Sequence, residues 1–236
     1  MTWTALGVVS AIVLLAGFVQ GSTGVGFALV VAPVLGLAAP ELLPVTVLVL
    51  MLPLNSYVAW RERAALDFPS GAWVTAGRFA GTFGGLWVLV VLSASHLNLL
   101  IGVLTVVAAA VTLAMPVFRP GRGVYVAAGL VTGVTETATG IGGPPLALVY
   151  QHHPVAVMRS TIALCFLIGE LVSLAFLWNA GRIAAPQLVA AAQLLPALGA
   201  GALLSRFVHR RIDARALRII VMSFSIVTGA VLVLRA

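Results

Sequence analysis

Two glycine-rich stretches contain the residue types that could bind a small anion inside an otherwise apolar chain. One is GFVQGSTGVGF at 17–27, and the other is GLVTGVTETATGIGGPP at 129–145. Both begin with Gly-x-x-x-Gly and end with Gly-x-Gly, so the same element occurs twice, with a few extra residues around 135–138 in the second copy. Helix-breaking glycines leave backbone groups that lipid cannot satisfy, so such segments are buried in protein or line a watery cavity. We interpret both stretches as walls of a polar site within the membrane.

The tips of these stretches predict two helix N-termini that converge on one site. A helix N-terminus presents free N–H groups and a positive dipole end, which suits a small oxyanion. Ser22 or Thr23 is expected to cap the first helix and Thr139 the second, while Pro144 fits a first helical turn. The glycines can instead serve helix packing alone, but packing does not explain the polar side chains at both tips. The residues expected to bind the substrate are Gln20, Gly21, Ser22, Thr23, Gly24, Gly26, Asn55, Thr135, Thr137, Thr139, Gly140, Gly142 and Gly143.

Glu136 and Glu170 are the two acids that lie within apolar segments. A carboxylate inside a membrane is expensive to leave unpaired, so both are candidates for proton coupling, and Glu136 is favoured because it lies at the proposed tip. A structural role, as partner of Arg78 or Arg159, is equally open. Arg78 itself either extends to the membrane surface, which we favour, or serves as a counter-charge for the anion.

The sequence carries no signature of an enzyme or of a metal site. It contains no G-x-S-x-G, H-E-x-x-H or P-loop motif, so we expect no catalytic residues and no cofactor. His152 and His153 are adjacent but have no further ligands at metal-binding spacing, so they are interpreted as interface residues. Cys165 lies in an apolar run and is interpreted as a small core residue.

Composition identifies an integral membrane protein. Sixty-one per cent of the 236 residues are hydrophobic and 8% are charged, whereas about a quarter of the residues in soluble domains are charged. Long continuous apolar runs indicate helices and not a barrel. The first apolar run lacks a basic leader and a cleavage site, so it is interpreted as a retained helix. The net charge of +7 is explained by basic loops on one side of the membrane, so nucleic acid is not an expected partner.

The apolar segments form two sets of five helical elements, which predict two transmembrane repeats in one membrane domain. The repeats cover residues 1–118 and 124–236, and an Arg-Pro-Gly-Arg-Gly loop joins them. Two elements in each repeat are too short or too broken to span easily, so each glycine-rich stretch is predicted to be a hairpin that enters the membrane and returns. The elements are 3–19, 26–37, 42–60, 72–92 and 97–115, then 124–134, 144–150, 155–178, 188–207 and 217–234.

The arginine distribution supports the hairpins. If each hairpin returns to its own side, only Arg182 and Arg235 face one side, and both termini are extracytoplasmic. The opposite, cytoplasmic side then holds Arg61, Arg63, Arg119, Arg122, Arg159, Arg206, Arg210, Arg211, Arg215 and Arg218. This asymmetry obeys the positive-inside rule. An odd number of crossings per repeat also inverts the second repeat relative to the first. The predicted fold is therefore an all-α membrane protein of two inverted repeats, each with a hairpin and three spanning helices.

The two glycine-rich stretches, each followed by long apolar helices, resemble the two repeats of the sulfite exporter TauE/SafE family. The resemblance covers essentially the whole chain. It implies a multi-pass permease of the bacterial cytoplasmic membrane that moves small sulfur-containing or organic anions, such as sulfite or sulfoacetate. Only the resemblance indicates that the transported anion contains sulfur.

These observations predict a secondary transporter that exports a small anion by alternating access. No nucleotide-binding motif is present, so the proton gradient or the membrane potential is the expected energy source. An anion channel and, less favoured, a membrane-embedded enzyme are the alternatives. The expected partners are a small anion and the lipid bilayer, and a homodimer is left open.

Overall fold

The computed structural model describes residues 3–114, 118–208 and 214–235. In these residues all ten predicted elements are α-helices, accompanied by two short 3-10 turns. In order they are α1 (Trp3–Thr23), α2 (Phe27–Ala38), η1 (Pro40–Leu42), α3 (Val45–Arg61), η2 (Arg63–Ala65), α4 (Phe68–Val91), α5 (Ala94–Ala114), α6 (Arg122–Thr139), α7 (Gly143–Tyr150), α8 (Val155–Asn179), α9 (Ala185–Val208) and α10 (Ala214–Arg235).

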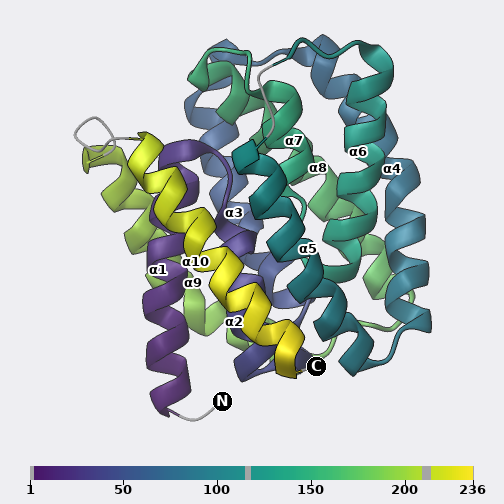
Figure 1. Ribbon diagram of the computed structural model, residues 1–236, viewed down its shortest axis with the longest axis vertical. Coiled ribbons are helices and arrows are strands. Elements are labelled where there is room, and N and C mark those ends of the chain that lie inside the picture. Colours follow the sequence, from purple (N-terminus) through teal and green to yellow (C-terminus); the bar gives the residue numbers. More distant parts are fainter. Residues whose placement is uncertain (1–2, 115–117, 209–213, 236) are drawn as a thin grey trace.

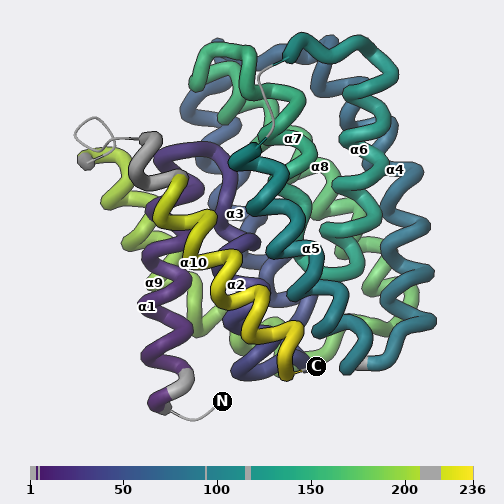
Figure 2. The backbone as a smooth tube through the Cα atoms, viewed as in Figure 1, coloured from purple at the N-terminus to yellow at the C-terminus, as the bar shows by residue number. Residues whose placement is uncertain are grey.

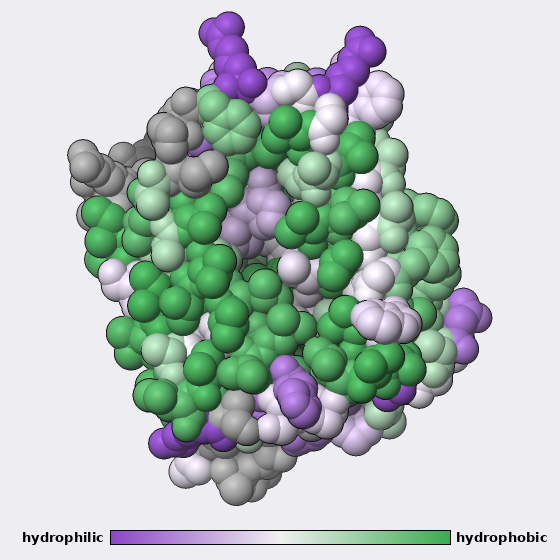
Figure 3. Space-filling view, turned by 45° about the vertical axis from the view of Figure 1, so that its right-hand side comes forward, coloured by the Kyte–Doolittle hydropathy of each residue, from purple (hydrophilic) through white to green (hydrophobic). Residues whose placement is uncertain are grey.

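Five helices are long and apolar enough to cross a membrane, in the segments Leu6–Thr23, Phe68–Val91, Ser95–Ala114, Val155–Asn179 and Ala185–Phe207. Large apolar side chains cover their outer faces. Trp87, for example, is 67% exposed and Phe207 is 74% exposed. Figure 3 shows this apolar surface as a broad band, with hydrophilic side chains gathered at its two ends. Exposed apolar side chains of this kind are stable against lipid and costly in water.

The helices pack in pairs that match between the two predicted repeats. Helix α4 lies along α6, and α9 lies along α1. Helix α3 packs on α8, and α5 packs on α10. Across these pairs α4 also contacts α8, just as α9 contacts α3. In Figures 1 and 2 the α4–α6 pair lies at one side of the molecule, and α1, α9 and α10 lie at the other.

Glycines allow the closest of these helix contacts. A β-carbon placed on Gly81 would collide with the carbonyl oxygen of Leu130, and one on Gly133 with the carbonyl oxygen of Arg78. In the other half, a β-carbon on Gly201 would collide with the carbonyl oxygen of Leu14. Small residues of α4 therefore serve close helix packing. The first glycines of the second stretch, Gly129 among them, have the same role, because Gly129 faces the Val74 carbonyl.

The two helix breaks are shorter than the sequence suggested. Helices α1 and α6 continue through the hydroxyl-rich segments, and only the residues between α1 and α2 and between α6 and α7 leave the helix. The hydroxyl of Thr23 lies 2.9 Å from the carbonyl oxygen of Val19 and 2.6 Å from that of Val25, and the hydroxyl of Thr139 donates to the carbonyl of Thr135 at 2.7 Å. A hydroxyl bonded to its own helix in this way is satisfied in a lipid environment. The expectation that the first helix of each hairpin ends early, at 19 and 134, was therefore wrong, and 135–138 are regular helix.

The short second helices are confirmed. Helix α2 has 12 residues and α7 has 8. Both termini lie at the lower end of Figure 1, while the end of α3 and the starts of α6 and α8 lie toward the upper end. The α8–α9 turn lies at the lower end. Arg210 and Arg211 lie outside the described residues, as do the side chains of Arg215 and Arg218.

Candidate functional site

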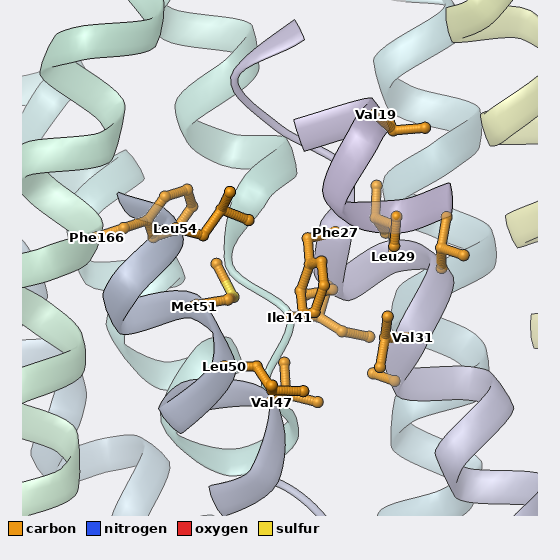
Figure 4. Close-up of a cluster of buried hydrophobic side chains, with 14 of the residues drawn as sticks. Val19, Phe27, Leu29, Val31, Val47, Leu50, Met51, Leu54, Ile141 and Phe166 are labelled. Atoms are coloured by element: carbon orange, nitrogen blue, oxygen red, sulfur yellow. The ribbon is translucent and has the colours of Figure 1, made fainter. Parts of the chain in front are cut away.

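The two helix breaks lie against each other in the interior of the protein. A β-carbon placed on Gly143, the first residue of α7, would lie 3.8 Å from Cβ of Val25 and 4.0 Å from the amide nitrogen of Gly26. Figure 4 shows Ile141, from the second break, beside Phe27 at the start of α2. Phe27 and Ile141 are both buried. The N-terminal ends of α2 and α7 therefore lie close together, as the glycine spacing predicted.

Backbone conformation explains why glycine occupies the breaks. Gly24, Gly26 and Gly140 have φ of +85°, +116° and +82°, which residues with a side chain rarely adopt. Gly140 ends α6 in this left-handed conformation, and its N–H bonds the carbonyl of Glu136 at 2.7 Å. The N–H of Gly24 bonds the carbonyl of Gln20 in the same way, at 2.7 Å. Gln20 and Glu136 therefore hold equivalent positions before their breaks.

Gln20 caps α2, a role that sequence reasoning assigned to its neighbours. Its Oε1 accepts a hydrogen bond from the N–H of Phe27 at 3.0 Å. Ser22 and Thr23 were expected to cap this helix, but the Ser22 hydroxyl donates to the carbonyl of Phe18 at 2.8 Å and Thr23 bonds the carbonyl of Val19. A long side chain one turn before the break reaches the first amide of α2, while hydroxyls at the helix end bond the preceding turn.

Hydrogen bonds continue from Gln20 into the centre of the protein. Its Nε2 donates to Oδ1 of Asn55 at 3.3 Å, and Nδ2 of Asn55 donates to Oε1 of Glu170 at 2.7 Å. All three side chains are buried. This chain links the first break to α3 and α8 and places Asn55, expected to bind the substrate, beside Glu170, expected to carry a proton.

Arg78 is buried and pairs with Glu136. Its Nη2 donates to Oε2 of Glu136, and the two side chains are 1% and 0% exposed. The guanidinium also lies over the ring of Phe166, with Cζ 5.1 Å from the centroid. The expectation that Arg78 extends to the membrane surface was wrong, because its position on α4 faces α6 and α8 and not lipid. We call Gln20, Asn55, Arg78, Glu136 and Glu170 the central polar cluster.

Several polar atoms of the central polar cluster lack a hydrogen-bond partner within the described part of the chain. They are Nε and Nη1 of Arg78, Oε1 of Glu136 and Oε2 of Glu170. Buried polar atoms are nearly always bonded in native proteins, and exceptions mark a bound water, an ion or a functional group. The cluster therefore has the capacity to bind a further polar species.

The second break is tied to this cluster through Glu136. A β-carbon on Gly142 would lie 2.9 Å from Cβ of Glu136, and the hydroxyl of Thr132 donates to the Gly142 carbonyl at 3.2 Å. Pro144 occupies the first turn of α7, as expected. Thr139 does not cap α7, because its hydroxyl bonds the carbonyl of Thr135 and accepts only from the N–H of Ile141, at 3.3 Å.

Some of the remaining predicted site residues lie at the site, and the others take part in helix packing. Thr137 bonds Ser173 of α8 at 2.7 Å, and Thr135 donates to the carbonyl of Thr132 at 3.4 Å. Gly21 lies against Ser205 of α9. These residues support the helices around the breaks. Of the predicted glycines, Gly26 and Gly143 lie at the contact between the two breaks, whereas Gly24 faces Arg159, Gly140 faces Val47 and Gly142 faces Glu136.

Three cavities approach the breaks along α5, and one of them, of about 200 Å³, lies beside Ile141 of the second break. The other two lie toward opposite ends of α5. A cavity of about 350 Å³ reaches Val19 and Val25 of the first break and is also lined by Thr112, near the end of α5. A smaller one of about 170 Å³ reaches Ala138, before the second break, and is lined by Asn98 near the start of α5. Beside the larger cavity, Arg159 pairs with Glu62 and donates through Nη1 to the carbonyl of Ser22 at 3.1 Å.

His152 and His153 follow α7, are half-buried and lie outside this site. Nε2 of His153 lies 3.2 Å from the hydroxyl of Tyr125 and 3.8 Å from Oδ2 of Asp67. Burial and the neighbouring His153 lower the pKa of His152. In the portion of the chain described, no three His, Cys, Asp or Glu side chains gather as a metal site.

Comparison with known proteins gives one match. The model of the sulfite exporter TauE/SafE family matches residues 9–232, which is nearly the whole chain. No curated protein and no solved structure matches.

Proposed function

The chain belongs to the sulfite exporter TauE/SafE family of membrane transporters, and from this membership we propose that it exports a small sulfur-containing or organic anion, such as sulfite or sulfoacetate, across the bacterial cytoplasmic membrane. The observation that carries the proposal is the contact between the N-terminal ends of α2 and α7, where Gly143 faces the Gly26 amide. Two helix N-termini that meet in a buried region favour a negative charge.

The binding groups follow from the geometry of the breaks. At α2 the N–H of Phe27 donates a hydrogen bond to Oε1 of Gln20. An oxygen of the bound anion would replace Oε1 as the acceptor. At α7 Pro144 and Pro145 have no N–H, so Gly142 and Gly143 supply the amides of the first turn. Arg78 adds a buried positive charge whose Nε and Nη1 have no partner among the described residues. These groups suit an anion of a few atoms.

Alternating access between two inverted repeats is the proposed mechanism. Its support is the matched packing of α4 on α6 and of α9 on α1. A cavity toward one end of α5 also reaches Val25 of the first break, and a smaller one toward the other end of α5 reaches Ala138 of α6. In transporters of this kind, the repeats rock around a fixed site near the middle of the membrane. The larger cavity then opens to the side that is rich in arginine, and the smaller one to the opposite side.

Uptake and counterflow of radiolabelled sulfite, sulfoacetate and sulfate in proteoliposomes test the proposal. A transporter shows counterflow, in which an internal anion drives uptake of the labelled one, whereas a channel does not. Complete absence of flux for all three anions would refute sulfur-anion transport, and flux without counterflow would favour the channel.

The Gly143→Ala variant tests the position of the site. Its methyl group has room, since the nearest atoms are 3.8 and 4.0 Å away, but it would stand beside the Gly26 amide and hold the anion away. Loss of one charge-assisted hydrogen bond costs about 1.5 to 3 kcal/mol, so affinity should fall roughly tenfold to a hundredfold. Gly199→Ala is the matched control, because no atom lies within 4 Å of its β-carbon. Equal affinities in both variants would remove the breaks from the site.

A further inference from the structure

We propose that Glu170 carries one exchangeable proton, and that Asn55 and Gln20 link this proton to the Phe27 amide, so that proton and anion bind together. The proposal rests on the proposed function, since it concerns the same anion site. It names the coupling ion, the residue that carries it and the connection between the two sites.

The charges of the central polar cluster require a proton. The cluster holds one guanidinium, Arg78, and two carboxyl groups, Glu136 and Glu170, and each of the three side chains is 1% exposed or less. Arg78 pairs with Glu136, and no ion pair between described residues includes Glu170. An unpaired buried carboxylate is costly, so a single proton that makes the cluster neutral is strongly favoured.

The hydrogen bonds assign that proton to Glu170. Glu136 is held by Arg78, which favours its ionised form. On Glu170, Oε1 accepts from Asn55 and Oε2 has no partner within the described residues, so Oε2 is the free oxygen on which the proton resides. The charged groups that face Glu170 are Arg78 of α4 and Glu136 of α6. Helix α3 presents Asn55, α7 carries no charged residue, and Arg63 of η2 is exposed.

The connection to the anion site is the chain from Glu170 to Phe27. Asn55 donates to Glu170 at 2.7 Å, Gln20 donates to Asn55 at 3.3 Å, and Gln20 accepts from the Phe27 N–H at 3.0 Å. An ionised Glu170 holds Asn55 by a charge-assisted bond, which is about twice as strong as a neutral one. That bond fixes Gln20 on the Phe27 amide and blocks the anion.

Protonation of Glu170 leaves the chain in place while no anion is bound, as in this structure, but weakens the bond between Asn55 and Glu170. Gln20 then yields the Phe27 N–H to the anion, so the anion binds when the proton is bound. Proton and anion consequently cross in the same direction. The charge moved per cycle is one unit more positive than that of the anion alone, and the direction of net flux follows the combined gradients.

Simultaneous measurement of anion and proton flux tests the coupling. Sulfoacetate is the probe, because both of its acid groups are ionised near neutral pH and it carries no proton itself. In proteoliposomes with an internal pH dye, the wild-type protein should move protons with sulfoacetate. Glu170→Gln should retain sulfoacetate exchange and lose the proton flux. Gly199→Ala, whose β-carbon has no atom within 4 Å, is the control and should behave as wild type. Proton flux that persists in Glu170→Gln would overturn the proposal.

Carbodiimide labelling tests the proton without transport and without a variant. Dicyclohexylcarbodiimide is apolar and modifies protonated carboxyl groups within membranes. In wild-type protein in lipid vesicles, mass spectrometry should find the adduct on Glu170, with less adduct as pH rises. An adduct confined to Glu136, or none on Glu170 across the pH series, would overturn the assignment. Failure of all sulfur anions to be transported would refute the proposed function and leave this result standing.

The link itself is tested by Asn55→Leu. The variant removes the middle of the chain and keeps both the acid and the helix N-termini. Glu170 should still take up the carbodiimide, while the ratio of protons to sulfoacetate should fall toward zero. An unchanged ratio would show that proton and anion communicate by another route.

Discussion

Arg78 and Glu136 neutralise each other's charge in the protein interior. Removing either side chain should therefore destabilise the fold. Arg78→Met leaves Glu136 buried without a cation, which typically destabilises a protein by about 3 to 5 kcal/mol. Replacing both residues, as in Arg78→Met with Glu136→Leu, removes both charges and should recover most of that loss. Thermal unfolding of the purified variants measures the effect. If the two single losses simply add in the double variant, the pair does not act as a unit.

The sequence identified the acids of this cluster and offered Arg78 as one possible partner, although it favoured Arg78 at the membrane surface. Glu136 and Glu170 were detectable because a carboxyl group in an apolar segment is rare. The burial of Arg78 had a signal in Gly77 and Gly81, which face α6 and lie close to Arg78 in the sequence. The role of Gln20 had no signal in the sequence, because its hydrogen bond to Phe27 depends on α1 continuing to Thr23 before the chain turns.

At the scale of the helices, contacts between glycines and backbone carbonyl groups of the facing helix determine how closely the helix pairs pack. Gly81 of α4 faces the Leu130 carbonyl, and Gly201 of α9 faces the Leu14 carbonyl, both too closely for a β-carbon. Gly81→Ala and Gly201→Ala should each push a helix pair apart and destabilise the protein by roughly 1 to 3 kcal/mol.

Thermal unfolding of these variants against Gly199→Ala checks the expectation. Gly199 lies on the same helix as Gly201 but has open space at its β-carbon, so alanine there should be neutral or slightly stabilising. Equal stability of all three variants would mean that α4–α6 and α1–α9 adjust without cost.

The helices themselves were predictable, and their ends at the breaks were not. Apolar runs bounded by glycine, proline and arginine gave all ten elements, because the length of an apolar run reflects the width of the bilayer. Residues 135–139 look like a loop by composition. They remain helical with the hydroxyls of Thr135 and Thr139 bonded to carbonyls of the preceding turn and that of Thr137 bonded to Ser173 of α8, and this choice depends on the absence of water around them.

At the scale of the whole molecule, the arginine asymmetry predicts which ends share one side of the membrane. Arg63, Arg119 and Arg182 are exposed, so each can be replaced by a single cysteine in a Cys165→Ala background. Membrane-impermeant thiol reagents should reach Arg63→Cys and Arg119→Cys from one side and Arg182→Cys from the other. Labelling of the first two from opposite sides would contradict the hairpins and the inverted repeats together.

Alternating access predicts that the two cavities change their accessibility in opposite directions, which a fixed pore would not do. Met158 lines the larger cavity and Asn98 lines the smaller one. In a transporter that exposes one cavity at a time, bound anion shifts the balance between the two conformations, provided that they differ in affinity for it. One cavity then becomes more accessible to a reagent and the other becomes less accessible. In the same cysteine background, we expect sulfite or sulfoacetate to slow the labelling of one of Met158→Cys and Asn98→Cys and to speed the other. The exposed Arg119→Cys should label at a constant rate and so control for effects on the reagent. Parallel changes at both positions would indicate occlusion of a channel, because a pore blocked by its anion loses access from both sides together.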